Sequence, residues 1–334
     1  MAIDIQDHHT RTANRKMGIA SFYAEKISPL ICGTSFGRRL NMAAVAFNAD
    51  LQFAASEYSD SGGRIFTDAE LEDLFLGLDS ASLALAKKFM RRQYRCPRNG
   101  FMVHPKYFYD DGERAEYRKI APEIRRTRRR LHLPFSAGPE SLYYHHGLRF
   151  APDFVKRRIA GRVFADIGGW LGDSALVFGN YAPACILIFE PIAANRQNLF
   201  RNLARNRVGK DLCKVMPFGL SDGNSLEDGM ECRTLDSVVP PAPFGVLKAD
   251  IEGMGLKFLK GAEATIRRDR PLLSLSIYHN EEEFSGIFRT IREWNIGYHC
   301  EIRQFSPLVM HGEYSLFAYP EEWGAADLNQ ALRQ

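Results

Sequence analysis

The sequence predicts an α/β protein: a Rossmann-like, mostly parallel sheet in the C-terminal half, preceded by a mainly helical N-terminal region. From Arg162 onward, short apolar runs alternate with helical stretches, which is typical of parallel β-α-β units. Only residues 306–313 separate the last two runs, which predicts a hairpin and therefore an antiparallel last strand. A glycine-rich turn follows the first run. We therefore expect two regions, 1–135 and 140–325.

Two helices are predicted in the N-terminal region. Thr67 and Glu70 have the spacing of a capping box, in which a hydroxyl and a carboxylate three residues later satisfy free backbone N–H groups. Apolar residues then follow at helical spacing from Leu71 onward. A second apolar face runs through residues 80–94, and Pro97 lies just beyond its end.

The segment 87–130 is strongly basic. It holds fifteen Lys and Arg residues against five Asp and Glu residues, although the whole chain has a net charge of only +4. Such a stretch can attract pyrophosphate, an anionic membrane surface or nucleic acid. It can equally be the solvated face of an arginine-rich helix such as 123–130. No recognisable nucleic-acid motif accompanies it, which makes nucleic acid an unfavoured partner.

The C-terminal region supplies the elements of the sheet. Seven strands are predicted, at 163–167, 185–189, 214–218, 246–251, 272–278, 299–305 and 314–319. Four helices are predicted between them, at 173–180, 193–206, 255–267 and 282–294.

Cysteine usage and hydropathy indicate a cytoplasmic protein. None of the six cysteines forms a C-x-x-C pair, so we expect reduced thiols and neither a disulfide framework nor a zinc site. The polar N-terminus lacks the apolar segment of a secretory signal. No apolar run approaches the ~20 residues that span a bilayer.

The sharpest motif joins the first strand of the sheet to the first helix. The letters VFADIGGWLGDS at 163–174 run from an apolar strand through a glycine-rich turn into a helix start. Glycine permits a tight turn and the close approach of a ligand. The next strand ends in Glu190, about 20 residues later, where an acid can bind ribose hydroxyls. The glycine spacing is not G-x-G-x-x-G, so an NAD-dependent oxidoreductase is a weak alternative.

Further motifs follow in order and carry a family resemblance. They are DIGG at 166–169, FEP at 189–191, LSD at 220–222, TLD at 234–236, and KADIEG at 248–253 with LKGA at 259–262. With them the sequence resembles the FkbM family of S-adenosylmethionine-dependent methyltransferases over about residues 140–320. The resemblance implies a class I methyltransferase sheet, S-adenosylmethionine as methyl donor, and a sugar or glycan hydroxyl as acceptor, on a nucleotide-sugar, a lipid-linked glycan or a polysaccharide.

The resemblance also implies which residues contact the donor. In chain order they are Asp166, Gly168, Gly169, Asp173, Ser174, Glu190, Ser221 and Asp222. The first five would hold the methionine and sulfonium end, Glu190 the ribose hydroxyls, and the last two the adenine. Trp170 departs from the family pattern, in which a polar residue is common at this position.

The acceptor is expected beyond the same ends of the strands. Methyl transfer to oxygen requires an aligned hydroxyl and a group that removes its proton. Asp250 and His279 end neighbouring strands, and ligands of an open α/β sheet bind beyond the carboxyl ends. We expect His279 as general base and Asp250 as the group that orients the acceptor. The other predicted substrate contacts are Glu252, His146 and Arg303. Asp250, Glu252 and Asp222 could hold a divalent metal ion, but no spacing requires one and none is assigned.

Two alternatives stay open for the function. The acceptor can be a hydroxyl of a natural product, or the chain can be a nucleic-acid-binding protein that uses its basic stretch. The N-terminal region can cover the acceptor pocket, form a homo-oligomer, or dock onto a glycan assembly complex.

Overall fold

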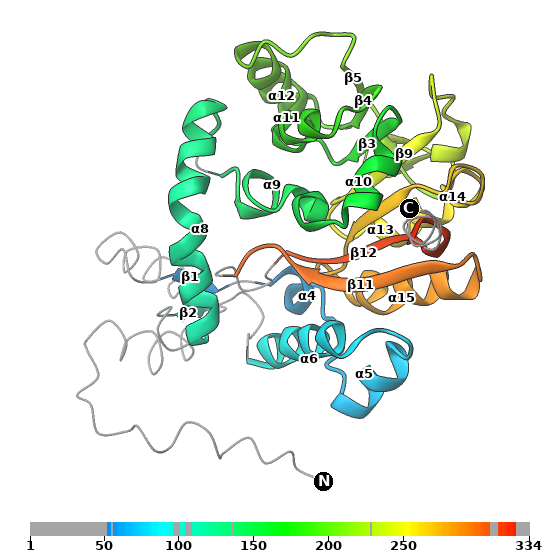
Figure 1. Cartoon of the computed structure of the whole chain (residues 1–334). Coiled ribbons are helices and arrows are strands. Elements are labelled where there is room, and N and C mark those ends of the chain that lie inside the picture. Colours follow the sequence, from blue (N-terminus) through cyan, green and yellow to red (C-terminus); the bar gives the residue numbers. More distant parts are fainter. Residues whose placement is uncertain are drawn as a thin grey trace, which may run out of the picture.

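Seven strands of the C-terminal region form one sheet at the centre of the molecule (Figure 1). The computed structural model of the chain describes residues 52–54, 56–95, 101–103, 109–134, 136–227, 229–307 and 313–324. In spatial order the strands are β11 (Tyr298–Gln304), β12 (Tyr314–Pro320), β10 (Leu272–Ser276), β9 (Phe244–Ala249), β3 (Val163–Ile167), β4 (Cys185–Phe189) and β5 (Cys213–Met216). Each of them overlaps a strand that the sequence predicts.

The directions of the strands confirm the predicted fold class. β12 runs antiparallel to both of its neighbours, β10 and β11, and the other paired strands are parallel. The chain lays β4 and β5 on one side of β3 and then returns to place β9 on the other side. The strand order therefore reverses between β3 and β9. At such a switch point the connecting loops diverge and leave a crevice for a ligand beyond the carboxyl ends of the strands.

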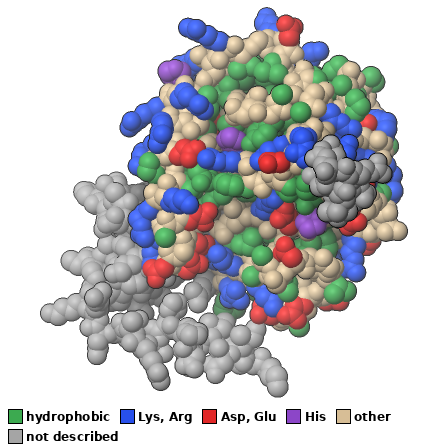
Figure 2. Space-filling model, viewed as in Figure 1, with side chains coloured by type: hydrophobic (Ala, Val, Ile, Leu, Met, Phe, Trp, Pro, Cys, Tyr) green, Lys and Arg blue, Asp and Glu red, His purple; other side chains and the backbone are tan. Residues whose placement is uncertain are grey.

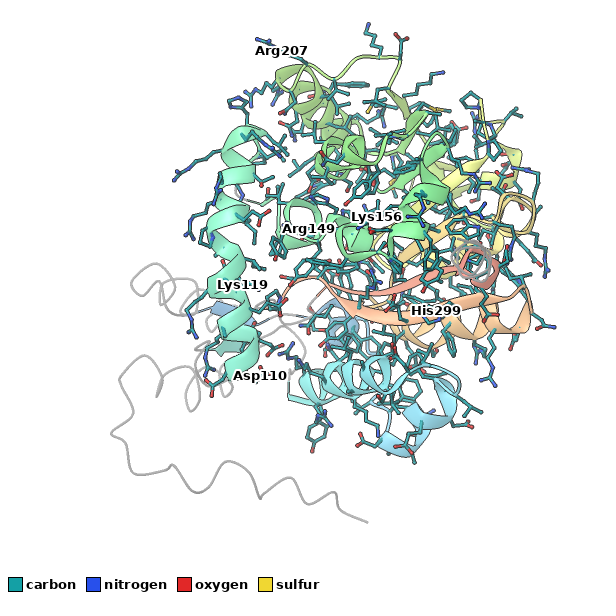
Figure 3. All side chains as sticks on the ribbon, in the orientation of Figure 1. Asp110, Lys119, Arg149, Lys156, Arg207 and His299 are labelled. Carbon is teal, nitrogen blue, oxygen red and sulfur yellow. The ribbon has the colours of Figure 1, made fainter. Side chains whose placement is uncertain are left out.

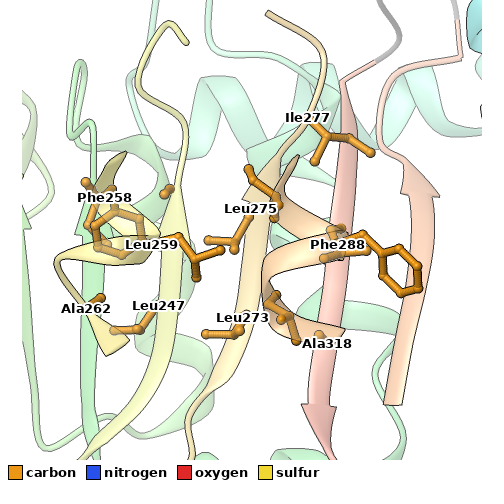
Figure 4. Close-up of a cluster of buried hydrophobic side chains, with 14 of the residues drawn as sticks. Leu247, Phe258, Leu259, Ala262, Leu273, Leu275, Ile277, Phe288 and Ala318 are labelled. Carbon is orange, nitrogen blue, oxygen red and sulfur yellow. The ribbon is translucent and has the colours of Figure 1, made fainter. Parts of the chain in front are cut away.

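Helices cover both faces of the sheet, and β3 shows why both faces are apolar. Successive side chains of a strand point to opposite faces. Ala165 packs in the cluster that contains α13 (Gly255–Lys260), α14 (Glu263–Asp269) and α15 (Glu281–Glu293). Phe164 packs in the cluster that contains α10 (Asp153–Ile159), α11 (Asp173–Phe178) and α12 (Ala193–Arg205). Figure 4 shows the first cluster, with the leucines of β10 between α13 and α15.

The helix predicted over 255–267 is two helices, because the chain bends at Gly261. A Cβ atom on Gly261 would lie 2.0 Å from the carbonyl oxygen of Ser221, so only glycine lets the two segments touch. Ser221 follows β6 (Gly219–Leu220), which joins β8 (Met230–Arg233) and β7 (Ser225–Glu227) in a small second sheet. The sequence does not predict this sheet, because strands of two to four mostly polar residues carry no clear periodicity.

The N-terminal helices pack directly on the sheet. They are α4 (Glu57–Asp60), α5 (Asp68–Leu74) and α6 (Ser80–Arg95), and the capping box of Thr67 and Glu70 is present at the start of α5. Phe89 of α6 stacks on Phe284 of α15 with ring centroids 5.0 Å apart, and Tyr58 of α4 contacts both rings. These helices and the sheet thus share one hydrophobic cluster. The boundary near residue 135 stays a sequence-based prediction.

The last part of the basic stretch, residues 111–130, is a helix that stands beside the sheet (Figure 1), and the first residues of the stretch belong to α6. α8 (Asp111–Arg130) begins at the Asp110 cap and continues through Pro122, where the sequence suggests only a shorter helix after the proline. Burial of Ile120, Ala121 and Ile124 outweighs the ~3 kcal/mol that an interior proline costs. Lys119 lies along the middle of α8, and Arg149 faces the helix and pairs with Glu123 at 2.7 Å (Figure 3). Lys and Arg side chains gather where the end of α8 lies near α12 (Figure 2).

Short elements complete the described chain. They are β1 (Gln52–Ala54), which pairs with β2 (Phe101–Val103), α9 (Pro139–Leu142), and the 3-10 turns η3 (His145–Phe150), η4 (Gly179–Tyr181) and η5 (Leu235–Ser237). Within the described ranges, no helix is both long and apolar enough to cross a membrane. The four described cysteines are free thiols, as predicted, and Cys32 and Cys96 lie outside the described residues.

Candidate functional site

The glycine-rich turn after β3 lies at the switch point of the sheet. Gly168 has a φ of +85°, and a Cβ atom there would lie 2.0 Å from the carbonyl oxygen of Asp250. Gly172 caps α11 with a φ of +73°. Between them Trp170 also adopts positive φ and is 43% exposed. The loops after β3 and β9 can therefore meet only because residue 168 has no side chain.

Glu190 closes the turn from the end of β4. Its side chain is buried, and Oε2 accepts the backbone N–H of Trp170 at 2.8 Å. Oε1 accepts the backbone N–H of Ile192 at 2.9 Å. The carboxylate is thereby fixed next to the glycine turn. Because each carboxylate oxygen has two acceptor positions, one position on each remains for hydroxyl groups of a ligand.

A buried ion pair lies directly under the turn. Lys248 Nζ on β9 is 3.0 Å from Asp166 Oδ1 and donates to the carbonyl oxygen of Gly168 at 3.1 Å. Burial raises the pKa of Asp166 to about 6, against the opposing effect of Lys248. Burial lowers the pKa of Lys248, but Asp166 and Asp250 outweigh it and raise that pKa to about 12. Within the described part of the chain, neither carboxylate oxygen of Asp166 accepts a hydrogen bond of good geometry.

Asp173 and Ser174 begin α11 as predicted, but both side chains face the segment before β3. Ser141 Oγ donates to Asp173 Oδ2 at 2.6 Å, and His146 Nε2 lies 2.9 Å from Ser174 Oγ. Burial, with a smaller effect of Lys248, lowers the pKa of His146 well below its ordinary value, so its ring is neutral. The structure thus joins His146, through Ser174, to the start of the helix that follows the glycine turn.

Ser221 and Asp222 lie at the small second sheet. The hydroxyl of Ser221 is buried and donates to Glu227 Oε1 at 2.6 Å. Asp222 Oδ1 lies 3.4 Å from the same hydroxyl. Gly219, two residues earlier, lies against Pro191, which follows Glu190. The chain therefore brings Ser221 toward the end of β4, and its contact with adenine stays a prediction.

Asp250 and His279 meet beyond the ends of β9 and β10. His279 Nε2 lies 3.1 Å from Asp250 Oδ1, and Nδ1 lies 2.7 Å from Glu283 Oε2. The hydroxyl of Tyr278 donates to Asp250 Oδ1 at 3.2 Å. His279 and Glu283 are both buried, whereas the Asp250 side chain is 24% exposed. The imidazole is therefore held between two carboxylates, of which Asp250 is the one that reaches solvent.

This arrangement sets the charge of the pair. Burial lowers the pKa of His279, but Asp250 and Glu283 outweigh it and raise that pKa to about 11. Burial raises the pKa of Asp250, but His279 and then Lys248 hold it below its usual range. At neutral pH the protein as described favours an imidazolium beside a carboxylate. His279 must lose its Nε2 proton before it can act as the predicted general base.

Arg303 holds the loop that carries His146. Nη1 donates to the carbonyl oxygen of Gly147 at 2.9 Å, and the guanidinium also pairs with Glu301. Its Cζ lies 3.6 Å from the centroid of the Phe317 ring. These contacts engage the guanidinium inside the protein, and a direct contact of Arg303 with substrate stays a prediction.

Two surface hollows lie at the glycine turn and at the small second sheet. One of about 580 Å³ borders the turn at Trp170 and Leu171 and includes His132, Arg201 and Arg205. Another of about 730 Å³ lies on the small second sheet around Arg233. Neither hollow is lined by Asp250 or His279, so the convergence of these two side chains, and not a hollow, marks the candidate reaction site.

Comparison with known proteins decides the family. A family model described as the methyltransferase FkbM domain matches residues 165–334, slightly more than half of the chain. The chain belongs to this family. Comparison with curated proteins gives no match.

Several solved structures are similar to this chain at low identity. A methyltransferase FkbM from Methylobacillus flagellatus is 20% identical over 61% of this chain and 60% of its own, with a TM-score of 0.44. The O-methyltransferase TomG from Streptomyces achromogenes, solved with S-adenosylmethionine, is 13% identical over 65% of this chain and 93% of its own, with a TM-score of 0.40. An O-methyltransferase from Bacillus cereus is 13% identical over 61% and 91%, with a TM-score of 0.41. The alignment thus spans less than two thirds of the Methylobacillus chain.

Four residues of the site were not predicted from the sequence. Lys248 stands inside the KADIEG block of the FkbM domain, and a lysine in an apolar strand is a signal that could have identified it. Glu283 follows Asn280 at capping-box spacing, and Tyr278 precedes His279. Glu57 lies 3.5 Å from His279 Nε2, and nothing in its local sequence indicates this contact.

Proposed function

We propose that the chain is an S-adenosylmethionine-dependent methyltransferase that methylates a hydroxyl of a sugar or glycan. One observation carries the proposal: the carboxylate of Glu190 is fixed against a glycine turn at the switch point of an FkbM domain. That is where a parallel sheet binds a nucleoside. The catalytic domain is proposed at 140–325, and the helical, basic region at 1–135.

The residues at the turn fit the donor. The buried carboxylate of Asp166 pairs with Lys248, but its oxygens accept no hydrogen bond of good geometry in the described chain, and this suits the ammonium of the methionine end as a further partner. The turn at Gly168 and Gly169 lets the donor approach the backbone closely. Glu190 would bind the ribose, and Ser221 and Asp222 the adenine. Asp173 and Ser174 would shape the methionine end through their contacts with the 141–146 segment.

The chemistry needs alignment and one proton acceptor. The methyl carbon leaves the sulfonium sulfur as the acceptor oxygen bonds to it, and the hydroxyl proton must leave. We assign that proton to the Asp250–His279 pair, whose facing atoms lie 3.1 Å apart. His279 is the member that the sequence favours, and Asp250 is the alternative within the pair. Holding the oxygen in line with the methyl group supplies the larger part of the acceleration.

The acceptor class rests on the family resemblance. A nucleotide-sugar or lipid-linked glycan would bring pyrophosphate, which the basic stretch on α8 can attract. Glu252, His146 and Arg303 are proposed to line the acceptor side. The hydroxyl of a natural product is the second candidate, since the same proton transfer would serve it.

Calorimetry tests the donor site first. We expect micromolar binding of S-adenosylmethionine to the full chain, loss of binding in Glu190→Ala, and no binding of NAD. Glu293→Ala, an exposed carboxylate at the end of α15, is the matched control and should bind the donor as the wild type does. A folded wild-type protein that binds no donor, with or without a glycan present, would overturn the proposal.

A further inference from the structure

Three side chains converge just outside the Asp250–His279 pair. Glu57 comes from α4, Glu252 from the loop after β9, and His279 from the end of β10. One ligand atom from each lies within 4.8 Å of the other two. Both glutamates are exposed, whereas His279 is 3% exposed, so two exposed carboxylates lie next to a buried ring nitrogen.

The buried nitrogen is an independent sign that something binds here. Nε2 of His279 lies 3.1 Å from Asp250 Oδ1 and 3.5 Å from Glu57 Oε2, yet in the described residues it has no hydrogen bond of good geometry. A buried polar atom without a well-directed partner is destabilising. A metal ion that displaces the Nε2 proton and takes the freed lone pair would give this nitrogen such a partner.

The Nδ1 side of the imidazole has the surroundings that are usual for a histidine that binds a metal ion. Nδ1 lies 2.7 Å from the buried carboxylate of Glu283, which also accepts the backbone N–H of Gly255 at 2.8 Å. The backbone N–H of Glu283 in turn donates to Asn280 at the start of α15. A histidine that binds a metal usually donates its second ring N–H to such a carboxylate, which fixes the tautomer and the ring.

We propose that Glu57, Glu252 and Nε2 of His279 bind a divalent metal ion beside Asp250, on the proposed acceptor side. Two carboxylates give the site a charge that a dication neutralises, and Asp250 adds a third beside it. One imidazole with two carboxylates suits a first-row ion such as Mn²⁺. Three protein ligands leave coordination positions open for water or a substrate oxygen.

The position of the ion deepens the proposed function. Asp250 touches both the glycine turn and His279, so the ion lies on the acceptor side of the donor. A role in methyl transfer rests on the proposed function: the ion would take the acceptor hydroxyl as a ligand and lower its pKa. His279 then serves as a ligand, and Asp250 is the member of the pair that accepts the proton.

One ligand comes from outside the matched family region. Glu57 precedes residue 165, where the FkbM match begins, by more than 100 residues. The contact of the neighbouring Tyr58 with Phe284 of α15 positions Glu57 near His279. The N-terminal region would thereby complete the acceptor site of this chain, which gives that region a chemical role.

Binding of Mn²⁺ to the full-length protein tests the site. The protein is freed of metal with chelator and titrated with MnCl₂, and the free ion is followed by its electron paramagnetic resonance signal. We expect one Mn²⁺ per chain and an affinity at least roughly tenfold weaker in Glu57→Gln, since even supporting residues of metal sites contribute that much. Asp60→Asn removes one charge from the same helix and should bind as the wild type does.

A second measurement keeps the test independent of folding defects. Electron spin echo modulation from a ring nitrogen should accompany Mn²⁺ in the wild type and in Asp60→Asn. No binding by folded wild-type protein, equal affinity in both α4 variants, or bound Mn²⁺ without nitrogen modulation would each overturn the proposal. Calorimetry with S-adenosylmethionine separates the metal proposal from the proposed function. Binding of Mn²⁺ without binding of the donor would support the metal site and contradict the methyltransferase function. Binding of the donor without binding of Mn²⁺ would contradict only the metal site.

Discussion

The proposed donor side and the proposed acceptor side of the site are built in different ways. The donor side uses neighbours in sequence: the turn at 168–172 and Glu190, which bonds to its backbone. The acceptor side gathers Glu57, Asp250 and His279 from three parts of the chain. The first depends on backbone shape and glycine, and the second on how helices pack against a sheet. Variants on the two sides should therefore fail in different ways.

The largest effect is expected at Gly168. In Gly168→Ala the new Cβ would lie 2.0 Å from the carbonyl oxygen of Asp250, so the turn must shift and donor binding should be lost. Gly161→Ala is the control, because Gly161 also has positive φ but no atom lies within 4 Å of its Cβ position. It should cost only about 1–2 kcal/mol of backbone strain. Calorimetry with donor and thermal unfolding measure both, and equal behaviour of the two variants would refute the close approach.

Lys248→Met should destabilise the whole protein by about 3–5 kcal/mol, because it leaves Asp166 buried without its partner. The free energy of unfolding in urea measures this loss. Asp166→Asn combined with Lys248→Met should recover part of it, since the unpaired charge is then gone. If the single variant is as stable as the wild type, the ion pair does not hold the turn.

His279→Gln should slow methyl transfer by roughly a hundredfold or more, as expected when proton transfer or metal binding is lost. Its affinity for the donor should change little, because the donor side is separate. His299→Gln, on the exposed side of β11, is the matched control and should retain full activity. Initial rates and donor affinity are measured for both variants. Loss of donor binding in His279→Gln alongside the loss of rate would contradict the separation of the donor side from the acceptor side.

The smallest effect is expected at the N-terminal capping box. Thr67→Ala removes the hydroxyl that accepts the backbone N–H of Glu70 and should cost about 1 kcal/mol. Because α5 contacts neither the turn nor Asp250 through any described hydrogen bond, donor affinity should stay unchanged. Chemical denaturation measures the free energy of unfolding. A change in donor affinity would contradict the prediction and show that the N-terminal helices influence the donor side.

Much of the fold followed from periodicity. Runs such as 163–167 and 185–189 are β3 and β4 with the predicted bounds, because strands buried on both faces are continuously apolar. The break of 255–267 into α13 and α14 was not predicted, because the contact of Gly261 with Ser221 joins distant parts of the chain. Pro122 likewise suggested a shorter helix than α8, since packing of the helix against its neighbours does not show in local sequence.

The sequence by itself determined the glycine turn and Glu190 of the proposed donor side, because a strand, a glycine turn, a helix start and an acid at the next strand end are local features that backbone geometry forces together. The sequence also identified the family, through motifs spread over the sheet. The sequence also placed Asp250 and His279 at neighbouring strand ends, but only the tertiary structure decided which groups surround them. Whether Glu57 meets His279, and whether two carboxylates enclose that imidazole, depends on how α4 and α15 pack. Such packing arises from hydrophobic burial between segments more than 200 residues apart, which no local pattern encodes.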